Sequence, residues 1–275
     1  MIALRRYGLT VIAVFSTVII FIVPFLFIVL TAIKDRTEAA RLDFSWPTNF
    51  PVWENFWTVI STRNFMLVTA YINSTLITVG AVTLLVILAA MVGYVRQRRK
   101  GWWNGLVDFL VLAGLMMPPA VVPTIWLLQE IGLFATLHGM VFIQVAYNLS
   151  FCIILYRAFI ATIPRELDEA AIIDGARPLD VFFRVILPLL KPVTVTVIVV
   201  QSVTIFNDFV NPLYYLPGNQ NVTVQLTLYN FQSQFSTAYN LLFMNILLVT
   251  IPPLIVFLFY NRQIVAGMTA GAVKG

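Results

Sequence analysis

The residues of this chain best suited to bind a solute gather in an apolar stretch near position 210. Asp208 is an acid surrounded in sequence by amides and aromatic rings, namely Asn207, Asn211, Tyr214 and Tyr215. Amides, carboxylates and aromatic faces bind sugars, so this set suits a hydroxylated solute. An acid inside an apolar span usually faces the interior of a helix bundle. Two interpretations of Asp208 stay open: it lines a solute path, or it caps a broken helix near Pro212 or pairs within a dimer.

Catalytic chemistry has few candidate residues. Cys152 is the single cysteine and His138 the single histidine, so a disulfide, a zinc site and a redox pair are all excluded. No HExxH motif is present, and no phosphate-binding loop of the G-x4-G-K-S/T type. We therefore expect no catalysis, no metal and no cofactor on this chain.

The composition predicts a membrane protein. Sixty per cent of the residues are hydrophobic and 11% are charged, whereas a soluble domain carries roughly 25% charged residues. Lipid removes the need for a charged surface. The net charge of +5 comes from basic residues that flank apolar stretches, so we expect lipid and no nucleic acid as a partner.

Six uncharged stretches are long enough to cross a bilayer, which takes roughly 20 residues. They lie at 7–33, 64–95, 109–129, 131–156, 192–216 and 240–261, and the fourth helix should start near His138. The first is too long for a signal peptide and reads as an uncleaved helix. We predict an all-α membrane protein with six transmembrane helices in a single domain, 1–275, with a core at 64–262.

The distribution of Lys and Arg predicts the orientation. With the N-terminus inside, four basic residues lie outside: Lys34, Arg36, Arg41 and Arg63. The other 13 of the 17 lie inside. Both termini should therefore be cytoplasmic, with 34–63 and 217–239 as outer segments.

The inner segment 157–191 differs from the other connections, because it holds five acids and five bases in 35 residues. Pro164 suits the first turn of a helix, and Gly175 is a natural stop. Pro178 then permits a second short helix, which Pro188 should end. A helix presented in this way can dock into a groove on a soluble partner.

This segment resembles the EAA loop of the permeases of ATP-binding-cassette (ABC) importers. Glu169-Ala170-Ala171, Gly175 and Val185-Ile186-Leu187-Pro188 follow the pattern E-A-A-x3-G-x9-I-x-L-P, with Val185 in place of the usual Ile. The resemblance implies a cytoplasmic coupling helix, between spans four and five, that fits a cleft of an ATPase subunit. It implies a coupling role for Glu169, Ala170, Ala171, Asp174, Gly175, Arg184 and Pro188. The alternative is an ordinary amphipathic inner loop.

Two further likenesses narrow the family to MalG-like permeases of carbohydrate uptake. The C-terminal segment 262–275 is similar to a tail that reaches between two ATPase subunits, which implies contacts by Thr269, Gly271 and Lys274. Phe206-Asn207-Asp208-Phe209 is similar to a Trp-Asn-Asp/Glu-Phe motif, from which Phe206 departs.

The resemblance implies a permease subunit in a prokaryotic cytoplasmic membrane, importing a di- or oligosaccharide or related solute. Its expected partners are a MalF-like second permease, two ABC ATPases that bind the ATP and Mg²⁺, and an extracytoplasmic solute-binding protein. The 217–239 segment is expected to contact that binding protein through Asn219, Tyr229, Asn230, Phe231 and Gln232.

The main alternative is a secondary transporter that needs no ATPase. Such proteins often show inverted repeats and charged residues at the membrane midplane. The sequence has no convincing repeat and almost no midplane charge, which favours the importer. A membrane enzyme and a receptor-like protein are further alternatives that the motifs disfavour.

Overall fold

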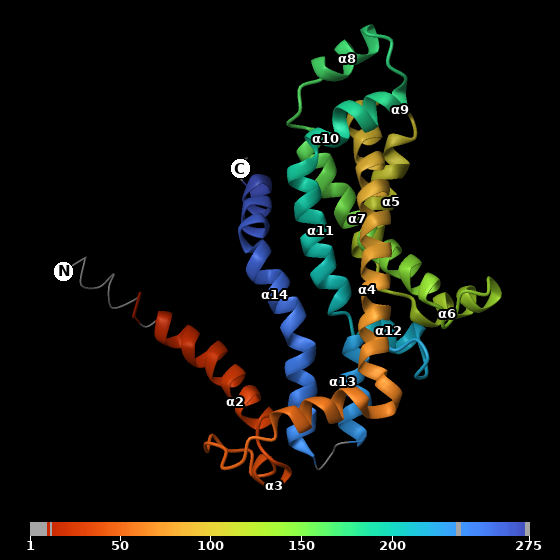
Figure 1. Ribbon diagram of the computed structural model, residues 1–275. Helices are drawn as coiled ribbons and strands as arrows, with labels where there is room; N and C mark the ends of the chain where they lie inside the picture. Colours follow the sequence, from red (N-terminus) through yellow and green to blue (C-terminus); the bar gives the residue numbers. More distant parts are fainter. Residues whose placement is uncertain (1–9, 12, 235–237, 273–275) are drawn as a thin grey trace. The chain divides into compact units, whose positions relative to one another are not determined.

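The computed structural model describes the backbone of residues 10–11, 13–234 and 238–272, and every element in these ranges is a helix (Figure 1). The predicted all-α class is therefore confirmed. The chain divides into two compact units. Unit 1 comprises Met1–Thr69 and Val224–Pro252, and unit 2 comprises Ala70–Thr223 and Pro253–Gly275.

Unit 1 is built around the end of an apolar N-terminal helix. Its elements are η1 (Val18–Ile22), α2 (Val23–Ala32), α3 (Arg36–Ala39), the first part of α4 (Val52–Arg98), α13 (Val224–Gln234) and the first part of α14 (Tyr239–Ala272). The last carbonyls of a helix have no partner within it. Here the side-chain amide of Asn55 donates to the carbonyls of Ala32 and Lys34, both at 2.9 Å. Asn240 donates in turn to Asn55 at 2.8 Å, so one amide network joins α2, α4 and α14.

A buried lysine stabilises the loop that follows α2. The Lys34 side chain is 1% exposed, and its ammonium pairs with the Asp43 carboxylate at 2.9 Å. Hydrogen bonds from Ser45 and Lys34 hold the pKa of Asp43 well below its usual value. A buried ammonium needs such partners, so this segment, which the sequence predicts to lie outside, is held in one conformation.

Helix α4 is broken near its first third. Residues 62–65 leave helical geometry, and Arg63, Asn64 and Phe65 have positive φ angles of 50°, 56° and 60°. The second predicted span, 64–95, is therefore confirmed as a helix from residue 66 onward, whereas 52–61 adds helical turns that the sequence did not indicate.

Unit 2 is a helical bundle with α7 at its centre. After the rest of α4 it contains α5 (Asn104–Met116), α6 (Val121–Glu130), α7 (Leu137–Ile160), α8 (Glu166–Ile173), α9 (Pro178–Asp180), η2 (Val181–Ile186), α10 (Leu187–Leu189), α11 (Lys191–Phe206) and α12 (Val210–Tyr215). Helix α7 packs against α5, α11 and α12. Helix α4 comes close to α7 at Gly93, where an added Cβ would lie 3.0 Å from the Cβ of Tyr156. Small residues permit such close approach between apolar helices.

Two of the predicted spans are interrupted. The third, 109–129, is not one helix, because the chain bends by 113° between α5 and α6. Proline lacks an N–H and disfavours helical geometry in the preceding residue, and Pro118-Pro119 lies at this bend. The fifth, 192–216, ends as α11 at Phe206 and resumes as α12 at Val210.

The remaining predicted boundaries agree in part. The fourth helix starts at Leu137, next to the predicted His138. The sixth starts at Tyr239 but does not end at 261, because α14 continues to Ala272 through residues that contain no proline. The outer segment 217–239 is not a simple loop, since it contains α13.

By length and apolarity, the described residues contain three helices able to cross a membrane: Ala13–Ala32, Val52–Arg98 and Leu137–Ile160. The number rises to five if each of two bent pairs, α5 with α6 and the Pro178–Leu189 segment with α11, forms one span. Tyr239–Ile255 is a shorter apolar helix.

Gly139 provides a test of the packing between α6 and α7. Its N–H donates to the capping hydroxyl of Thr136 at 3.0 Å, and an added Cβ would lie 2.1 Å from the carbonyl oxygen of Leu133. We expect Gly139→Ala to destabilise the protein by about 1–3 kcal/mol, as overpacking does. Gly105→Ala is the control, because no heavy atom lies within 4 Å of its added Cβ. Thermal unfolding in detergent measures both, and equal midpoints would contradict this packing.

Candidate coupling site and polar pocket

Helix α8 carries the start of the motif found in the sequence, and its two ends are well defined. Glu166, Asp168 and Glu169 lie in its first turn, where negative charge favours the helix dipole. At the other end Gly175 has a φ of 84°, as its role of stop predicted. The N–H groups of Gly175 and Ala176 donate to the carbonyls of Ile172 and Ala171, both at 3.0 Å. This is the hydrogen-bond pattern of a Schellman motif, which closes a helix C-terminus.

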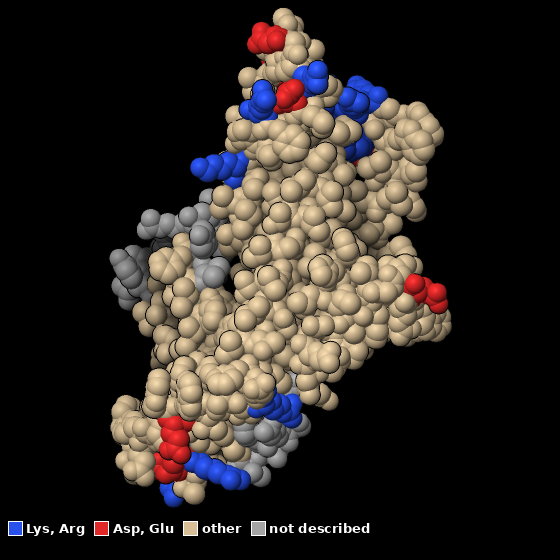
Figure 2. Space-filling model, turned by 45° about the vertical axis from the view of Figure 1, so that its right-hand side comes forward, with Lys and Arg blue, Asp and Glu red and all other residues tan. Residues whose placement is uncertain are grey.

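The two faces of α8 differ in character. Asp168 and Ala171 are buried, whereas Ile172 is 61% and Ile173 85% exposed. Leu179, in α9, is 62% exposed. Figure 2 shows charged residues gathered at the end of unit 2 that carries these helices, above a surface that is almost free of charge. An exposed apolar face with charges around it is typical of a protein-docking surface.

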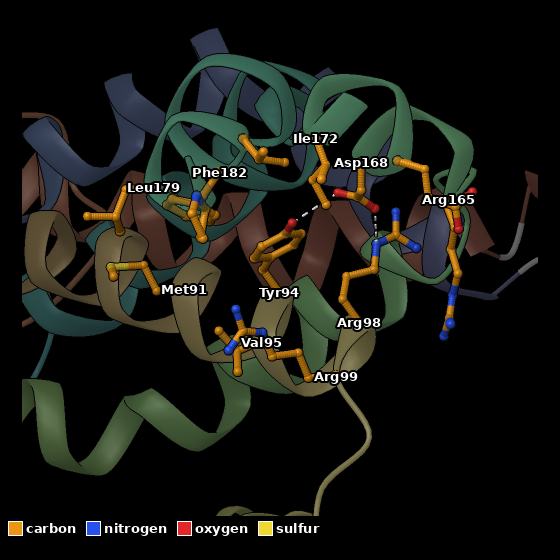
Figure 3. Close-up of a pocket in the computed structure, with 13 residues that line it drawn as sticks. Met91, Tyr94, Val95, Arg98, Arg99, Arg165, Asp168, Ile172, Leu179 and Phe182 are labelled. Atoms are coloured by element: carbon orange, nitrogen blue, oxygen red, sulfur yellow. Dashed lines mark hydrogen bonds and ion pairs between the residues drawn. The ribbon is translucent and has the colours of Figure 1, made fainter. Parts of the chain in front are cut away.

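A buried ion pair fixes α8 to the end of α4. The Arg98 Nε lies 2.6 Å from Asp168 Oδ2, and both side chains are 10% exposed. The Tyr94 hydroxyl donates to the other oxygen of Asp168 at 3.0 Å (Figure 3). Arg98 also donates through Nη2 to the carbonyl of Ile163 at 3.0 Å. Because buried charges require partners, α8 and α4 are held together at this point. We call this arrangement of Tyr94, Arg98 and Asp168 the α4–α8 clamp.

A pocket of about 430 Å³ lies beside the α4–α8 clamp. Figure 3 shows apolar side chains from three segments around it, Met91 from α4, Ile172 from α8 and Phe182 from η2. The pocket thus lies where α4, α8 and η2 meet, next to the α4–α8 clamp.

A second ionic cluster connects the end of α4 to α5 and α7. Asp108, at the start of α5, pairs with Arg96 of α4 and with Arg157 of α7, the latter at 2.8 Å. The helices that lead to α8 are therefore connected to one another at the same end of unit 2.

The structure brings most of the motif residues onto α8 and the turn after it. Glu169 is exposed and lines the pocket, Ala170 is exposed, and Ala171 is buried. Asp174 is the C-cap of α8. The exposed Arg184 lies further on, in η2, and pairs with Asp180 at 3.4 Å.

Pro188 differs from its predicted role. It lies inside α10, which continues to Leu189, and so does not end the second helix. Proline is tolerated in a first helical turn, where its missing N–H has no helical partner to lose. The bend of 75° that precedes α11 falls after Leu189 instead.

Asp208 lies at the break between α11 and α12, beside an open polar pocket of about 360 Å³. Its carboxylate accepts hydrogen bonds from the side chain of Gln144, from the backbone N–H of Asn211 at 3.2 Å and from the side chain of Asn211 at 2.7 Å. Both interpretations of Asp208 agree with this geometry, because it caps α12 and also lines the pocket.

Of the five residues that the sequence groups near position 210, Asp208 and Asn211 line this pocket, whereas Asn207, Tyr214 and Tyr215 do not. Asn207 donates to the carbonyl of Val203 in its own helix at 2.9 Å, and Tyr214 is exposed elsewhere. The sequence interpretation missed Gln144, Tyr147 and Asn148 of α7. Their spacing of i, i+3 and i+4 in an apolar helix was the available signal, because it places them on one face.

The structure describes some of the residues predicted to contact the binding protein and the ATPases. Asn219 is exposed, and Tyr229 on α13 is 58% exposed. The side chains of Asn230, Phe231 and Gln232 lie outside the described residues, although their backbone belongs to α13. Thr269 and Gly271 belong to α14 by backbone alone, and Lys274 lies outside the described residues.

Known sugar-import permeases are similar to this chain over most of its length. The MelC protein of Bacillus subtilis (strain 168), a melibiose/raffinose/stachyose import permease protein, is 30% identical over 257 residues, 92% of this chain and 91% of its own length. The NgcG protein of Streptomyces coelicolor, a diacetylchitobiose uptake system permease protein, is 29% identical and covers 93% of this chain and 85% of its own.

A solved structure has the same fold. One chain of a bacterial ABC transporter involved in the import of the acidic polysaccharide alginate superposes with a TM-score of 0.78 at 19% identity, covering 94% of this chain and 96% of its own. The profile of the family described as "Binding-protein-dependent transport system inner membrane component" matches residues 85–268. The chain therefore belongs to this family of transport permeases.

Proposed function

We propose that this chain is the permease subunit of an ATP-driven sugar importer and performs no catalysis itself. The observation that carries the proposal is α8, an exposed helix with the EAA pattern that a buried ion pair fixes to α4. The relatives support a sugar as the solute, since they are named as permeases for melibiose, raffinose and stachyose or for diacetylchitobiose. In this proposal the chain crosses a prokaryotic cytoplasmic membrane six times as one domain, with both termini and α8 inside.

The proposed assembly contains this chain, a MalF-like second permease, two ABC ATPases and an extracytoplasmic binding protein. A related structure, of an alginate transporter with a pentasaccharide-bound periplasmic protein, matches with a TM-score of 0.66 at 16% identity, which supports the same fold. ATP and Mg²⁺ bind the ATPases. Thr269, Gly271 and Lys274 of the tail are proposed to contact them.

In this assembly the energy of ATP binding and hydrolysis reaches the permease through the contact between the ATPases and α8. Closure of the ATPase pair around ATP displaces α8, and the α4–α8 clamp transfers that displacement to α4. The permease pair rocks from inward-facing to outward-facing as a largely rigid body. In this proposal the ATPases bind the nucleotide, and α8 contributes the shape and charge of the docking surface.

Glu169 provides the test of coupling. We expect Glu169→Lys to lower binding-protein-stimulated ATPase activity by roughly tenfold or more, because it reverses a charge on the docking surface. Glu166→Lys is the matched control, since it also removes an exposed first-turn acid of α8 but lies outside the motif. The measurement uses the assembled complex in nanodiscs with loaded binding protein. Transport by this chain without any ATPase, unchanged in Glu169→Lys, would instead favour a secondary transporter.

Tyr229 tests the proposed contact with the binding protein. The whole segment is unsuited to deletion, because Val224, Leu226 and Thr227 in α13 are buried. We expect Tyr229→Ala to raise the concentration of binding protein needed for half-maximal ATPase stimulation by roughly tenfold, as truncation of an interface aromatic does. Trp46→Ala, which removes a 72% exposed aromatic ring from the other outer segment, should leave it unchanged. Equal titrations for Tyr229→Ala and the wild type would remove Tyr229 from the interface.

A further inference from the structure

We infer that this subunit contains its own solute subsite, in which the pocket beside Asp208 binds an uncharged sugar and rejects acidic ones. The inference rests on the proposed function and adds a substrate class to it. The pocket is defined by residues of unit 2 alone: Gly114, Leu115, Met117, Pro119, Gln144, Tyr147, Asn148, Thr204, Asp208 and Asn211. Its volume of about 360 Å³ lies within the range of small-molecule pockets, about 300–1,000 Å³.

The pocket exists because three helices are interrupted or polar at the same level. Helix α5 ends at Met116, just before the Pro118-Pro119 bend. Helix α11 ends at Phe206, which leaves Asp208 in the break before α12 and places Asn211 in the first turn of α12. Helix α7 passes unbroken and contributes Gln144, Tyr147 and Asn148. The residues from α5 and the bend after it are therefore apolar, and those from α7, α11 and α12 are polar, as in sites that bind a ring with hydroxyl groups.

Part of the polar side is free to bind a ligand. The Asn148 amide nitrogen donates to the Gln144 carbonyl at 2.8 Å, and the Asn211 amide nitrogen donates to Asp208. Among the described residues, nothing donates to the side-chain oxygen of Asn148 or of Asn211. These two oxygens and the second lone pairs of the Asp208 carboxylate can accept hydrogen bonds from sugar hydroxyls.

The charge of the pocket decides which sugars fit. All three groups that contact the Asp208 carboxylate are N–H donors, which suits a charged carboxylate, an acceptor only. Among the described residues that line the pocket, none is Lys or Arg. A carboxylate brought beside Asp208 would therefore meet a like charge without a compensating cation. A neutral sugar has no such penalty.

The test places a reactive thiol in the pocket. Thr204 is exposed, lines the pocket and hydrogen-bonds only its own helix at Val200, so Thr204→Cys is conservative. Cys152 is buried and is replaced by serine. The assembled complex in nanodiscs is labelled with a cationic and an anionic methanethiosulfonate reagent. Thr162→Cys is the control, because that exposed threonine follows α7, donates only to the carbonyl of Phe159 and does not line the pocket.

We expect the cationic reagent to label position 204 at least about tenfold faster than the anionic one, as an anionic cleft concentrates cations. Asp208→Asn should remove that preference at position 204 and leave the ratio at position 162 unchanged. A preference that survives Asp208→Asn, or one absent with Asp208 intact, would overturn the inference. The comparison of the two reagents at position 204 with Asp208 intact does not depend on the folding of the Asp208→Asn variant.

Solute protection supplies the second measurement. Raffinose, diacetylchitobiose and arabinotriose are the neutral probes and trigalacturonate is the acidic probe. We expect at least one neutral sugar, and not trigalacturonate, to slow labelling at position 204 several-fold. Protection by trigalacturonate, or by none of the four, would overturn the inference. If the complex keeps binding-protein-stimulated ATPase activity but shows no protection, the proposed function stands and only this subsite is wrong. If the unlabelled wild-type complex shows no stimulated ATPase activity, the proposed function itself is contradicted.

Discussion

The ion pair between Arg98 and Asp168 is the interaction on which the proposed coupling depends. Helix α8 has only eight residues, too few for a helix to be stable alone in water. A pocket lined by residues of α4, α8 and η2 also lies beside it. The α4–α8 clamp supplies the fixed point, since it joins a buried acid of α8 to the last turn of α4. In the proposed coupling, a force applied to the exposed face of α8 reaches α4 through this ion pair.

Unit 2 concentrates its polar groups at two levels with an apolar body between them. At one level the ion pairs of Arg98 and of Asp108 connect the ends of α4, α5, α7 and α8. At the other, the breaks in α5 and α11 leave room for Gln144, Asp208 and Asn211. Polar groups in lipid surroundings are stable only where they find partners or water. The same constraint thus produces both a rigid coupling end and an open polar pocket.

Local signals in the sequence predicted local features well. Gly175 ends α8, and α7 starts beside His138, because a stop and a cap depend on neighbouring residues. Features that depend on distant residues were missed. Arg98 and Asp168 are 70 positions apart, and nothing in either segment indicates their pairing. Pro118-Pro119 is a local signal for a break in the third span, but the 113° angle of the bend depends on packing around α7.

The α4–α8 clamp is tested most directly by the number of sugar molecules transported per ATP hydrolysed, in proteoliposomes that contain the full complex. Asp168→Asn leaves the buried Arg98 without its charged partner, a change that typically costs about 3–5 kcal/mol. Asp180→Asn removes the exposed pair with Arg184, worth about 0–1 kcal/mol. The account predicts a several-fold lower ratio for Asp168→Asn and an unchanged ratio for Asp180→Asn. Equal ratios in assembled, ATP-hydrolysing complexes of both variants would contradict it.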